Sequence, residues 1–502
     1  MLAEHSRKYL LLATIMGSGI AFVDSSIVNV ILPILQTDFN ASSAEVQWIV
    51  EIYTLSLSSL LLISGRLGDL YGRNKIYLWG IALFAVSSIL CGLSQSLWML
   101  VASRFLQGIG GAMMIPGSLA LLSVHFPPEE RGTAIGQWSA YSGVFTALGP
   151  VIGGLLTEYL SWRFAFFLNI PFCILTYYLV KNHVPETKSE ETSVKIDYAG
   201  SFLSILVPAS ITFAFLEYPR LGFQHPLFYL NCGIGVVGGI LFLWVEKKAH
   251  EPMLPLDLFF ARDFFILNVL TLLLYAGLGG ALFFLPFHLI QVLQYSPTQA
   301  AASLFPFPIF FFIFSRLTGK FADKYGVKPL LFVGPLLTSL GFLLLSYVNI
   351  RSSYLESFLA PIATIAMGMG ITVTPLTTAV MLFGSDSKRG VVSGINNAIS
   401  RTAGLLAIAI LGLILFFSFR GQLEKELPNV LKPQQSQQII SQSEKLAAVK
   451  IPKSFSQIEK EQVQETIYHS FSHSLQIILR ICFFLSFLSS LFALLLTQKS
   501  KT

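Results

Sequence analysis

The chain contains fourteen apolar runs separated by shorter polar segments. A helix of about 20 apolar residues crosses a hydrocarbon core of about 30 Å, so each run is long enough for one transmembrane helix. Only 12% of the residues are charged and 54% are hydrophobic, whereas soluble domains carry about 25% charged residues. We therefore predict an all-α polytopic membrane protein with fourteen transmembrane helices. The predicted spans lie near residues 10–32, 47–65, 76–95, 98–122, 134–157, 164–181, 198–216, 227–245, 264–290, 300–318, 329–348, 354–383, 391–418 and 472–497.

Composition argues against several other classes of protein. The net charge is +6, but the cations are scattered through short segments instead of forming a basic patch, so no nucleic-acid partner is expected. The first run contains Asp24, has no small-residue cleavage site and is too long for a signal peptide, so we expect it to remain as the first span. Neither a disulfide framework nor a metal site is expected, because no CxxC or Cys/His cluster occurs. The four cysteines are Cys91, Cys173, Cys232 and Cys482, each in a different run.

The distribution of basic residues predicts the orientation. With the N-terminus in the cytoplasm, twenty Lys and Arg residues fall in cytoplasmic segments, against three in short external loops. Cytoplasmic loops of membrane proteins carry such an excess. An even number of spans then returns the C-terminus to the cytoplasm, and the protein is expected in the cell membrane.

A short charged turn occurs twice. Gly65 to Lys75 reads GRLGDLYGRNK, and Gly319 to Pro329, 254 positions later, reads GKFADKYGVKP. The pair Arg131-Gly132 likewise returns as Arg389-Gly390 after 258 positions. The first turn follows the second span and its copy follows the tenth, so two extra spans separate two six-span repeats. Parallel six-span repeats around a central substrate path are one layout of secondary transporters.

The repeat predicts three parts. They are an N-terminal six-helix bundle (1–182), two inserted helices with flanking loops (183–262) and a C-terminal six-helix bundle (263–502). The last part includes a long external segment, about 420–470, that is rich in Gln, Ser, Lys and Glu. We expect a solvated hairpin or a disordered loop there, although 434–447 and 455–467 have the composition of polar helices.

Charged residues inside the predicted spans are the main functional candidates. A charge at the centre of a span costs about 2.5–3.5 kcal/mol on insertion scales, so such residues are rare unless they have a role. Asp24 in span 1 and Arg104 in span 4 lie at similar depths from the outer surface, which makes an ion pair feasible. Such a pair would exchange a proton during transport or simply lock the two spans together. Glu51, near the outer side of span 2, is a further proton-coupling candidate, or reaches the interface.

Polar residues on other spans are candidates for a substrate cavity. On span 4, Gln107 shares a helical face with Arg104, and the other residues of that face are small. Aromatic and polar side chains on span 5 suit flat apolar cations, and equally suit ordinary packing. Polar residues on span 13 would line the cavity or hold neighbouring carbonyl groups. These candidates are Gln137, Trp138 and Tyr141 on span 5, and Asn396, Asn397 and Arg401 on span 13.

Two glycine-containing stretches have mechanical interpretations. Span 5 ends in a proline among small residues, which predicts a bend and a close helix contact; these are Gly149, Pro150, Gly153 and Gly154. The repeated turn predicts a charged latch that holds one arrangement of the two halves, or a plain determinant of topology. Its gating candidates are Gly65, Asp69, Gly72, Arg73 and, in the second copy, Asp323.

Several of these stretches resemble the major facilitator superfamily, and in particular its fourteen-span drug:proton antiporter branch. Gly65 to Lys75 is similar to the signature between spans 2 and 3. Four further motifs are similar to this branch: VDSSIVNVILP in span 1, SRFLQGIGGA in span 4, ALGPVIGG in span 5 and SWRFAFFLNIP at the start of span 6. They cover Val23–Pro33, Ser103–Ala112, Ala147–Gly154 and Ser161–Pro171.

The resemblance implies proton-coupled efflux of lipophilic, often cationic, small molecules by alternating access. The proton gradient would be the energy source, without a bound cofactor. It implies proton coupling by Asp24 and Arg104, and a gating network that includes Asp69 and Arg73. Asn29, within the span 1 motif, joins the cavity candidates.

Two residues depart from the branch pattern. Phe145 stands where the span 5 motif usually opens with glycine, and Val327 stands where the first turn has Arg73. The two turns therefore cannot be equivalent, and we expect the first to be the principal latch.

Other functions remain open on the same fold. A dedicated exporter of one metabolite, lipid or natural product is the main alternative, followed by a proton-coupled importer and a non-transporting sensor. A membrane-embedded enzyme would need an acid/base or metal cluster, and a primary pump would need a GxxxxGK[ST] phosphate loop; neither pattern occurs. The expected partners are a small-molecule substrate and the lipid bilayer, with a monomer as the expected state.

Overall fold

A computed structural model describes residues 4–187, 197–249, 254, 256–347, 354–381, 383 and 389–497, and the regular elements in these ranges are helical. Within them, thirteen helices are long and apolar enough to cross a membrane. They correspond to every predicted span except the second. That span corresponds to α2 (Ser43–Tyr71), a helix of 29 residues that the count of thirteen does not include. The predicted all-α polytopic fold is confirmed.

The first compact unit contains residues 1–35, 48–210 and 233–253. Its interior is formed where α3 packs against α4 and α7. Small residues allow the close approach: a Cβ atom at Gly110 of α4 would lie 2.8 Å from the backbone nitrogen of Phe84 on α3. The helices that contribute to this unit, wholly or in part, are α1 (Glu4–Asp38), α2, α3 (Arg73–Gly92), α4 (Leu97–His125), α5 (Pro128–Tyr159), α6 (Arg163–Phe167), α7 (Asn169–His183), α8 (Tyr198–Leu221) and α9 (Pro226–Lys248).

The second compact unit contains residues 36–47, 211–232 and 254–502. Here α13 packs against α14 and α17, while α10 packs against α15 and α17. Its elements after α9 are η1 (Leu256–Phe260), α10 (Arg262–Phe287), η2 (His288–Val292), α11 (Pro297–Leu304), α12 (Pro306–Tyr325), α13 (Val327–Leu345), η3 (Leu355–Leu359), α14 (Ala360–Met381), α15 (Arg389–Glu426), η4 (Leu427–Asn429), α16 (Pro433–Ile440), η5 (Ser443–Ala448) and α17 (Gln457–Leu494). The two units cut across the inserted helices, and the predicted three-part division stays a prediction.

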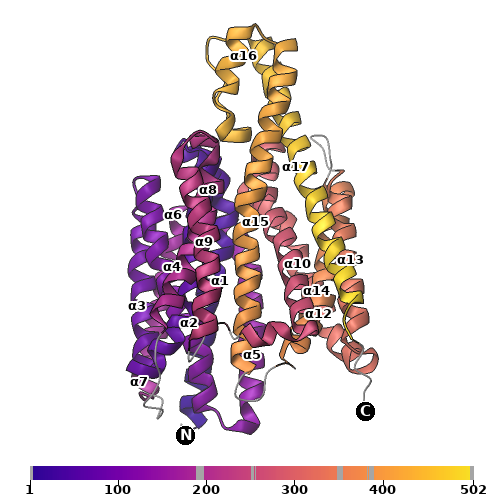
Figure 1. Cartoon of the computed structure of the whole chain (residues 1–502). Helices are drawn as coiled ribbons and strands as arrows, with labels where there is room; N and C mark the ends of the chain where they lie inside the picture. Colours follow the sequence, from indigo (N-terminus) through magenta and orange to yellow (C-terminus); the bar gives the residue numbers. More distant parts are fainter. Residues whose placement is uncertain are drawn as a thin grey trace. The chain divides into compact units, whose positions relative to one another are not determined.

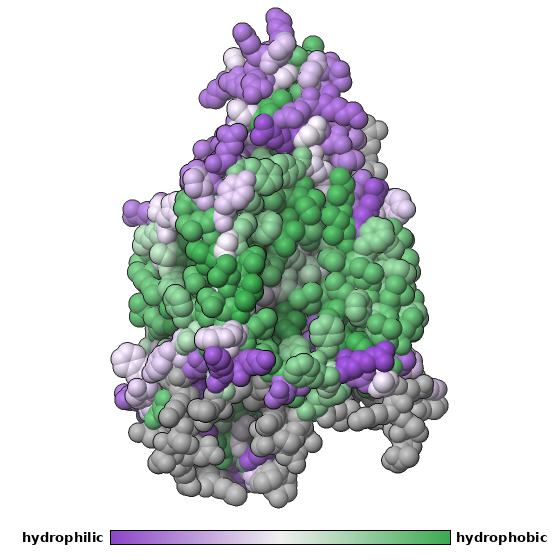
Figure 2. Space-filling model, in the orientation of Figure 1, coloured by the Kyte–Doolittle hydropathy of each residue, from purple (hydrophilic) through white to green (hydrophobic). Residues whose placement is uncertain are grey.

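Residues 420–456, which we call the cap, comprise the last turns of α15 together with η4, α16, η5 and the residues that lead into α17. Figure 1 shows the cap with α16 at the end of these helices that is remote from the C-terminus. Its surface is hydrophilic, whereas the helices below it present a hydrophobic surface (Figure 2). The cap has an apolar interior of its own, made of Leu423, Leu427, Ile439, Leu446 and Phe455, each at most 4% exposed. The alternative of a disordered loop is therefore wrong, because a few well-spaced apolar residues supply a small core despite the polar composition.

Hydrogen bonds join the cap to the end of α1 and to the connection that follows it. Lys445 donates from Nζ to Asn40 Oδ1 over 3.0 Å, and its backbone oxygen accepts from Gln36 Nε2 at the same distance. Gln291 of η2 donates to Gln36 Oε1 over 2.9 Å. These contacts explain why the α1–α2 connection belongs to the second unit although α1 itself begins in the first.

Candidate functional site

Asp24 of α1 is the centre of a buried polar cluster in the first unit. Its side chain is 1% exposed, and Arg104 of α4, its ion-pair partner, is equally buried. Arg104 Nη1 donates to Asp24 Oδ2. The other carboxylate oxygen, Oδ1, accepts from Gln107 Nε2 over 2.9 Å and from Asn169 Nδ2 over 2.8 Å. Asp24 thus has three side-chain donors from two other helices, α4 and α7.

Arg104 is held from several sides. On its own helix, Nη1 also donates to Gln107 Oε1 over 2.7 Å, because residues three apart on a helix are neighbours. From α2, the backbone oxygen of Ile49 accepts from Nε over 3.2 Å, and the Tyr53 ring lies 4.1 Å from the guanidinium carbon. A desolvated guanidinium over an aromatic face is favourable. Arg104 therefore keeps partners other than Asp24.

Ser88 of α3 connects the two amides of the cluster. Its Oγ accepts from Gln107 Nε2 over 2.9 Å and from Asn169 Nδ2 over 3.2 Å. The sequence interpretation named Gln107 but missed Asn169 and Ser88. Asn169 lies within the SWRFAFFLNIP stretch, so a signal for it existed, whereas an isolated serine in an apolar run gives none.

The bend motif of α5 packs directly against the turn of α1 that carries Asp24. A Cβ atom at Gly149 would lie 1.8 Å from Ser26 Oγ and 2.9 Å from the backbone oxygen of Val23. Pro150 lies inside the same helix, and both Gly153 and Gly154 are buried. Small residues are required here because the two backbones are nearly in contact.

Phe145, the departure from the branch pattern, fills a space left by another glycine. A Cβ atom at Gly19 of α1 would come within 2.5 Å of the Phe145 ring. The bulky side chain is therefore matched by a small partner on α1 instead of crowding that helix.

Glu51 and Asn29 form no hydrogen bond with the Asp24 cluster in the described part of the chain. Glu51 is fully buried, and neither of its carboxylate oxygens has a hydrogen-bond partner among the described residues. A buried charge without a partner is costly, so this carboxyl group is unusual for a purely structural position. Asn29 is half-buried, and its Oδ1 accepts no hydrogen bond from the described part of the chain.

The span 5 candidates divide into two environments. Gln137 lines a cavity of about 380 Å³ at the starts of α1 and α5, where Arg7 donates to Glu130 over 2.6 Å. Tyr141 is exposed, whereas Trp138 is buried beside Phe22 with 6.4 Å between ring centroids. In the described part of the chain, none of the three forms a hydrogen bond with Asp24 or Arg104.

The candidates on α15 belong to the second unit. Asn396 donates from Nδ2 to Asn268 Oδ1 over 3.0 Å and to Thr271 Oγ1 over 2.8 Å, both on α10. Asn397 is exposed and Arg401 is half-buried. This polar centre is therefore built on amides and a hydroxyl group.

The first charged turn is organised by a residue that sequence reasoning missed. Gly72 has φ of 115°, a conformation that L side chains rarely adopt. Glu186, after α7, accepts from the backbone nitrogens of Asn74 and Lys75 over 3.0 Å, so its carboxylate caps the N-terminus of α3. Arg73 also donates its backbone N–H to Thr187 over 2.9 Å. Gly65 has open space around it, and the side chains of Asp69 and Asp323 lie outside the described residues.

The comparisons decide the family. The family model described as "Major Facilitator Superfamily" matches residues 14–409. The chain belongs to the major facilitator superfamily. It is therefore a multi-pass membrane transporter that handles small molecules, and not an enzyme, and the expected family is confirmed.

Named relatives of this transporter include resistance and export proteins. It is 32% identical over 418 residues to the multidrug resistance protein Stp of Mycobacterium tuberculosis (strain CDC 1551 / Oshkosh), covering 83% of this chain and 77% of Stp. It is 31% identical over 409 residues to the tetracenomycin C resistance and export protein of Streptomyces glaucescens, covering 81% and 75% of the two chains.

Solved structures support the fold. A bacterial homologue of the human lysosomal transporter Spinster, in an inward-facing and unoccupied conformation, matches with a TM-score of 0.65 at 17% identity and covers 98% of both chains. A D-xylose–proton symporter matches with a TM-score of 0.58 at 16% identity, covering 81% of this chain and 90% of the other. At these identities the likeness concerns the fold alone.

Proposed function

We propose that this transporter is a proton-coupled exporter of lipophilic, cationic compounds that works by alternating access. The observation that carries the proposal is the buried Asp24 carboxylate with its three side-chain donors. The names of two relatives, a multidrug resistance protein and a tetracenomycin C resistance and export protein, support export as the direction and a drug as the substrate.

The geometry around Asp24 supports the coupling of a proton to a change of contacts. Oδ2 of Asp24 receives the Arg104 N–H, so a proton bound at Oδ2 would take the place of that hydrogen bond. Protonation and the ion pair therefore exclude one another. Arg104 would still be held by Ile49 and Tyr53 of α2, while Asp24 would keep only the hydrogen bonds that Gln107 and Asn169 donate to Oδ1. Proton entry thus becomes a shift in the packing of α1, which is what a coupled transporter requires.

Glu51 is the second proton carrier of the proposal. It lies on α2, two residues from both Ile49 and Tyr53, and is fully buried without a hydrogen-bond partner among the described residues. A proton would remove the cost of burying its charge. Proton binding at Glu51 and ion-pair breakage at Asp24 would then act on the two helices, α2 and α1, that touch Arg104.

In this proposal the other candidate residues bind substrate, allow helix movement or control gating. Substrate would contact the cavity candidates on α5 and α15, the bend of α5 would let that helix move against α1, and the turn from Gly65 to Lys75 would act as the cytoplasmic latch. Both termini would lie in the cytoplasm of a cell whose membrane holds the protein. The proton gradient would be the energy source without a cofactor, and the transporter would act as a monomer.

The test uses purified protein in liposomes with an imposed proton gradient and a fluorescent lipophilic cation. We expect Asp24→Asn to reduce uphill dye movement to the leak of empty liposomes, because the amide cannot exchange a proton. Asp263→Asn is the matched control, since Asp263 bonds Thr497 at the end of α17 and should leave transport intact. Uphill transport by Asp24→Asn at the wild-type rate would overturn the assignment.

Competition separates the main proposal from a dedicated exporter. Unrelated lipophilic cations should slow dye transport if the cavity accepts many compounds. A transporter that ignores all of them and moves a single compound would instead be the dedicated exporter.

A further inference from the structure

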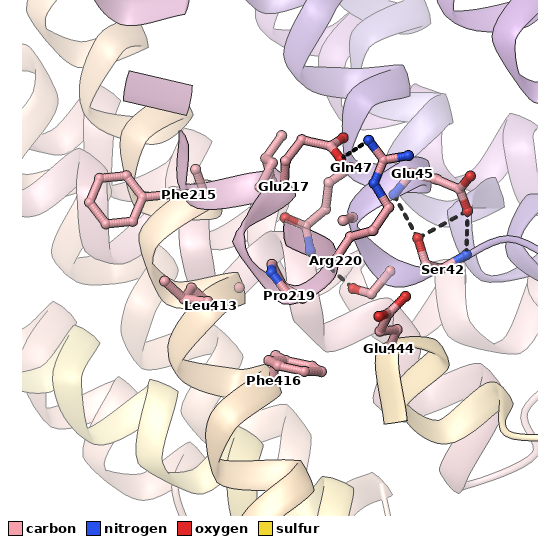
Figure 3. A pocket seen from close by; sticks show the side chains of 15 residues that line it. Ser42, Glu45, Gln47, Phe215, Glu217, Pro219, Arg220, Leu413, Phe416 and Glu444 are labelled. Atoms are coloured by element: carbon pink, nitrogen blue, oxygen red, sulfur yellow. Dashed lines mark hydrogen bonds and ion pairs between the residues drawn. The ribbon is translucent and has the colours of Figure 1, made fainter. Parts of the chain in front are cut away.

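A small cavity in the second unit lies beneath the cap. The cavity volume is about 30 Å³, and one water molecule needs about 10–15 Å³ by the same measure. The cavity therefore has room for an ammonium group and the carbon atom bonded to it. Three helix segments and the cap line it: the start of α2, the end of α8, the middle of α15 and Glu444 (Figure 3). All of these residues belong to the second unit.

The cavity has an excess of negative charge. Glu45, Glu217 and Glu444 line it together with one cation, Arg220. Arg220 pairs with the buried Glu217 over 2.9 Å while its own side chain is 65% exposed. Glu45 is occupied at the N-terminus of α2, where it accepts from the backbone nitrogen of Ser42 over 2.8 Å.

Glu444 is the carboxylate of this group without such a partner in the described structure. Burial raises the pKa of Glu444, and the negative charges of Glu45 and Glu217 raise it further, against the opposing effect of Arg220 and Arg420. A bound cation would offset both the cost of burying the Glu444 charge and the repulsion of that charge by Glu45 and Glu217.

A buried acceptor provides the second, independent observation. Gln47 is 3% exposed, and its Nε2 donates to Ser43 Oγ over 3.0 Å. Its Oε1 is buried and accepts no hydrogen bond from the described residues. Buried polar atoms in native structures are normally satisfied, so this amide oxygen calls for a donor. Gly412 of α15 lies beside this oxygen and leaves space around it, because a side chain at that position would place its Cβ atom only 2.8 Å from Gln47 Oε1.

The walls of the cavity select the kind of cation. Phe215, Leu413 and Phe416 line one side (Figure 3), which suits a hydrocarbon chain and the face of an ammonium group. No group of three or more metal-ligating side chains occurs among the described residues. An ammonium group differs from a metal ion in that it donates hydrogen bonds to separate acceptors and needs no closed shell of ligands.

We propose that this cavity binds a primary ammonium group attached to a hydrocarbon chain, with Glu444 and Gln47 Oε1 as acceptors and the aromatic wall around the chain. The ligand could be a free alkylamine or the head group of an aminophospholipid, since both carry this chemistry. Binding at this site does not depend on proton coupling at Asp24.

The experiment measures n-butylammonium binding to the full-length transporter in detergent without a proton gradient, by calorimetry. We expect saturable binding that weakens at least fivefold in Glu444→Gln and in Gln47→Met, each of which removes one acceptor. Glu461→Gln is the matched control, because the exposed Glu461 of α17 accepts a hydrogen bond from Gln457 and does not line the cavity, so this variant should bind as the wild type does. Tetramethylammonium, which has no N–H donor, should bind at least fivefold more weakly than n-butylammonium.

Three results would overturn the proposal. They are no saturable binding to the wild type, unchanged binding in both acceptor variants, and displacement of n-butylammonium by equimolar sodium or calcium. The same binding measurement in nanodiscs identifies the source of the ligand. If phosphatidylethanolamine competes with n-butylammonium and phosphatidylcholine does not, the ligand is a lipid head group. If neither lipid competes, the ligand is a free amine. Transport by Asp24→Asn is assayed separately, so failure of the proposed export function and failure of this site give different results.

Discussion

The two units solve the same packing problem with different polar centres. In the first unit, the facing helices α1 and α4 meet through the Asp24–Arg104 ion pair. In the second, α10 and α15 meet through the neutral contacts of Asn396 with Asn268 and Thr271. Adding the repeat offsets of 254 and 258 to position 104 gives 358 and 362, which are Phe358 and Ile362, both buried and apolar. The duplicated fold therefore does not need the ion pair.

The two charged turns share a backbone conformation but differ in what surrounds it. Gly72 and Gly326 both have positive φ, 115° and 78°, so each copy needs glycine at the turn. The first turn is closed by the Glu186 carboxylate, whereas no atom of the described residues lies within 4 Å of a Cβ atom built at Gly326. Backbone geometry is therefore shared between the copies, and the Glu186 carboxylate is a charged contact of the first turn.

The largest effect should come from breaking the ion pair. Arg104→Leu leaves the buried Asp24 charge unpaired, which costs about 3–5 kcal/mol and should abolish transport. The measurement is the melting temperature of the purified protein together with dye efflux. The double variant Asp24→Asn/Arg104→Leu should recover much of the stability but no transport. In the second unit, Arg401→Leu serves as the comparison and should cost less; an equal loss would contradict the proposed difference between the units.

The next effect concerns the glycines of the two turns. Gly72→Ala forces a side chain into a left-handed conformation at a cost of about 1–3 kcal/mol and also pushes the new methyl group into the Glu186 carboxylate. Gly326→Ala meets the backbone strain, and no atom of the described residues lies within 4 Å of the new methyl group. We expect a larger drop in melting temperature and efflux for Gly72→Ala. The comparison fails if Gly326→Ala proves the more damaging.

The acidic residues of the turns test the latch directly. Asp69→Asn should lower the initial rate of efflux several-fold more than Asp323→Asn, because the first turn has Arg73 where the second has Val327. Both variants must be compared at equal amounts of protein in the liposomes. Equal rates would mean that the copies contribute alike.

The smallest effect is expected in the neutral centre. Asn396→Ala removes two hydrogen bonds of about 1 kcal/mol each, partly offset because Asn268 and Thr271 keep their own bonds to backbone oxygens of α10. Transport should fall only modestly and its dependence on the proton gradient should be unchanged. A loss as large as that of Asp24→Asn would show that the second unit also carries coupling.

Several residues of the candidate site were predictable, because a charged residue inside an apolar run has a high free energy of membrane insertion and is rare unless it has a role. Asp24 and Arg104 are conspicuous as charges inside apolar runs, and Gln107 follows from the helical face of Arg104. Ser88, Asn169 and Glu186 were not singled out, since a serine, an asparagine and a loop glutamate cost little in isolation. Their importance arises only from the groups that face them.

Hydrophobic length determined that the chain is an all-α polytopic protein, because a membrane admits only helices that satisfy their own backbone hydrogen bonds. The spacing of the repeat predicts a six-two-six order, which stays a prediction. Tertiary structure alone decided which helices close around Asp24, why Phe145 faces Gly19, and that residues 420–456 form a cap fastened to α1. It also decided that Gln47 and Glu444, more than 390 positions apart in the chain, line one cavity. Such contacts depend on how specific side chains pack across distant segments, and no local pattern in the sequence encodes them.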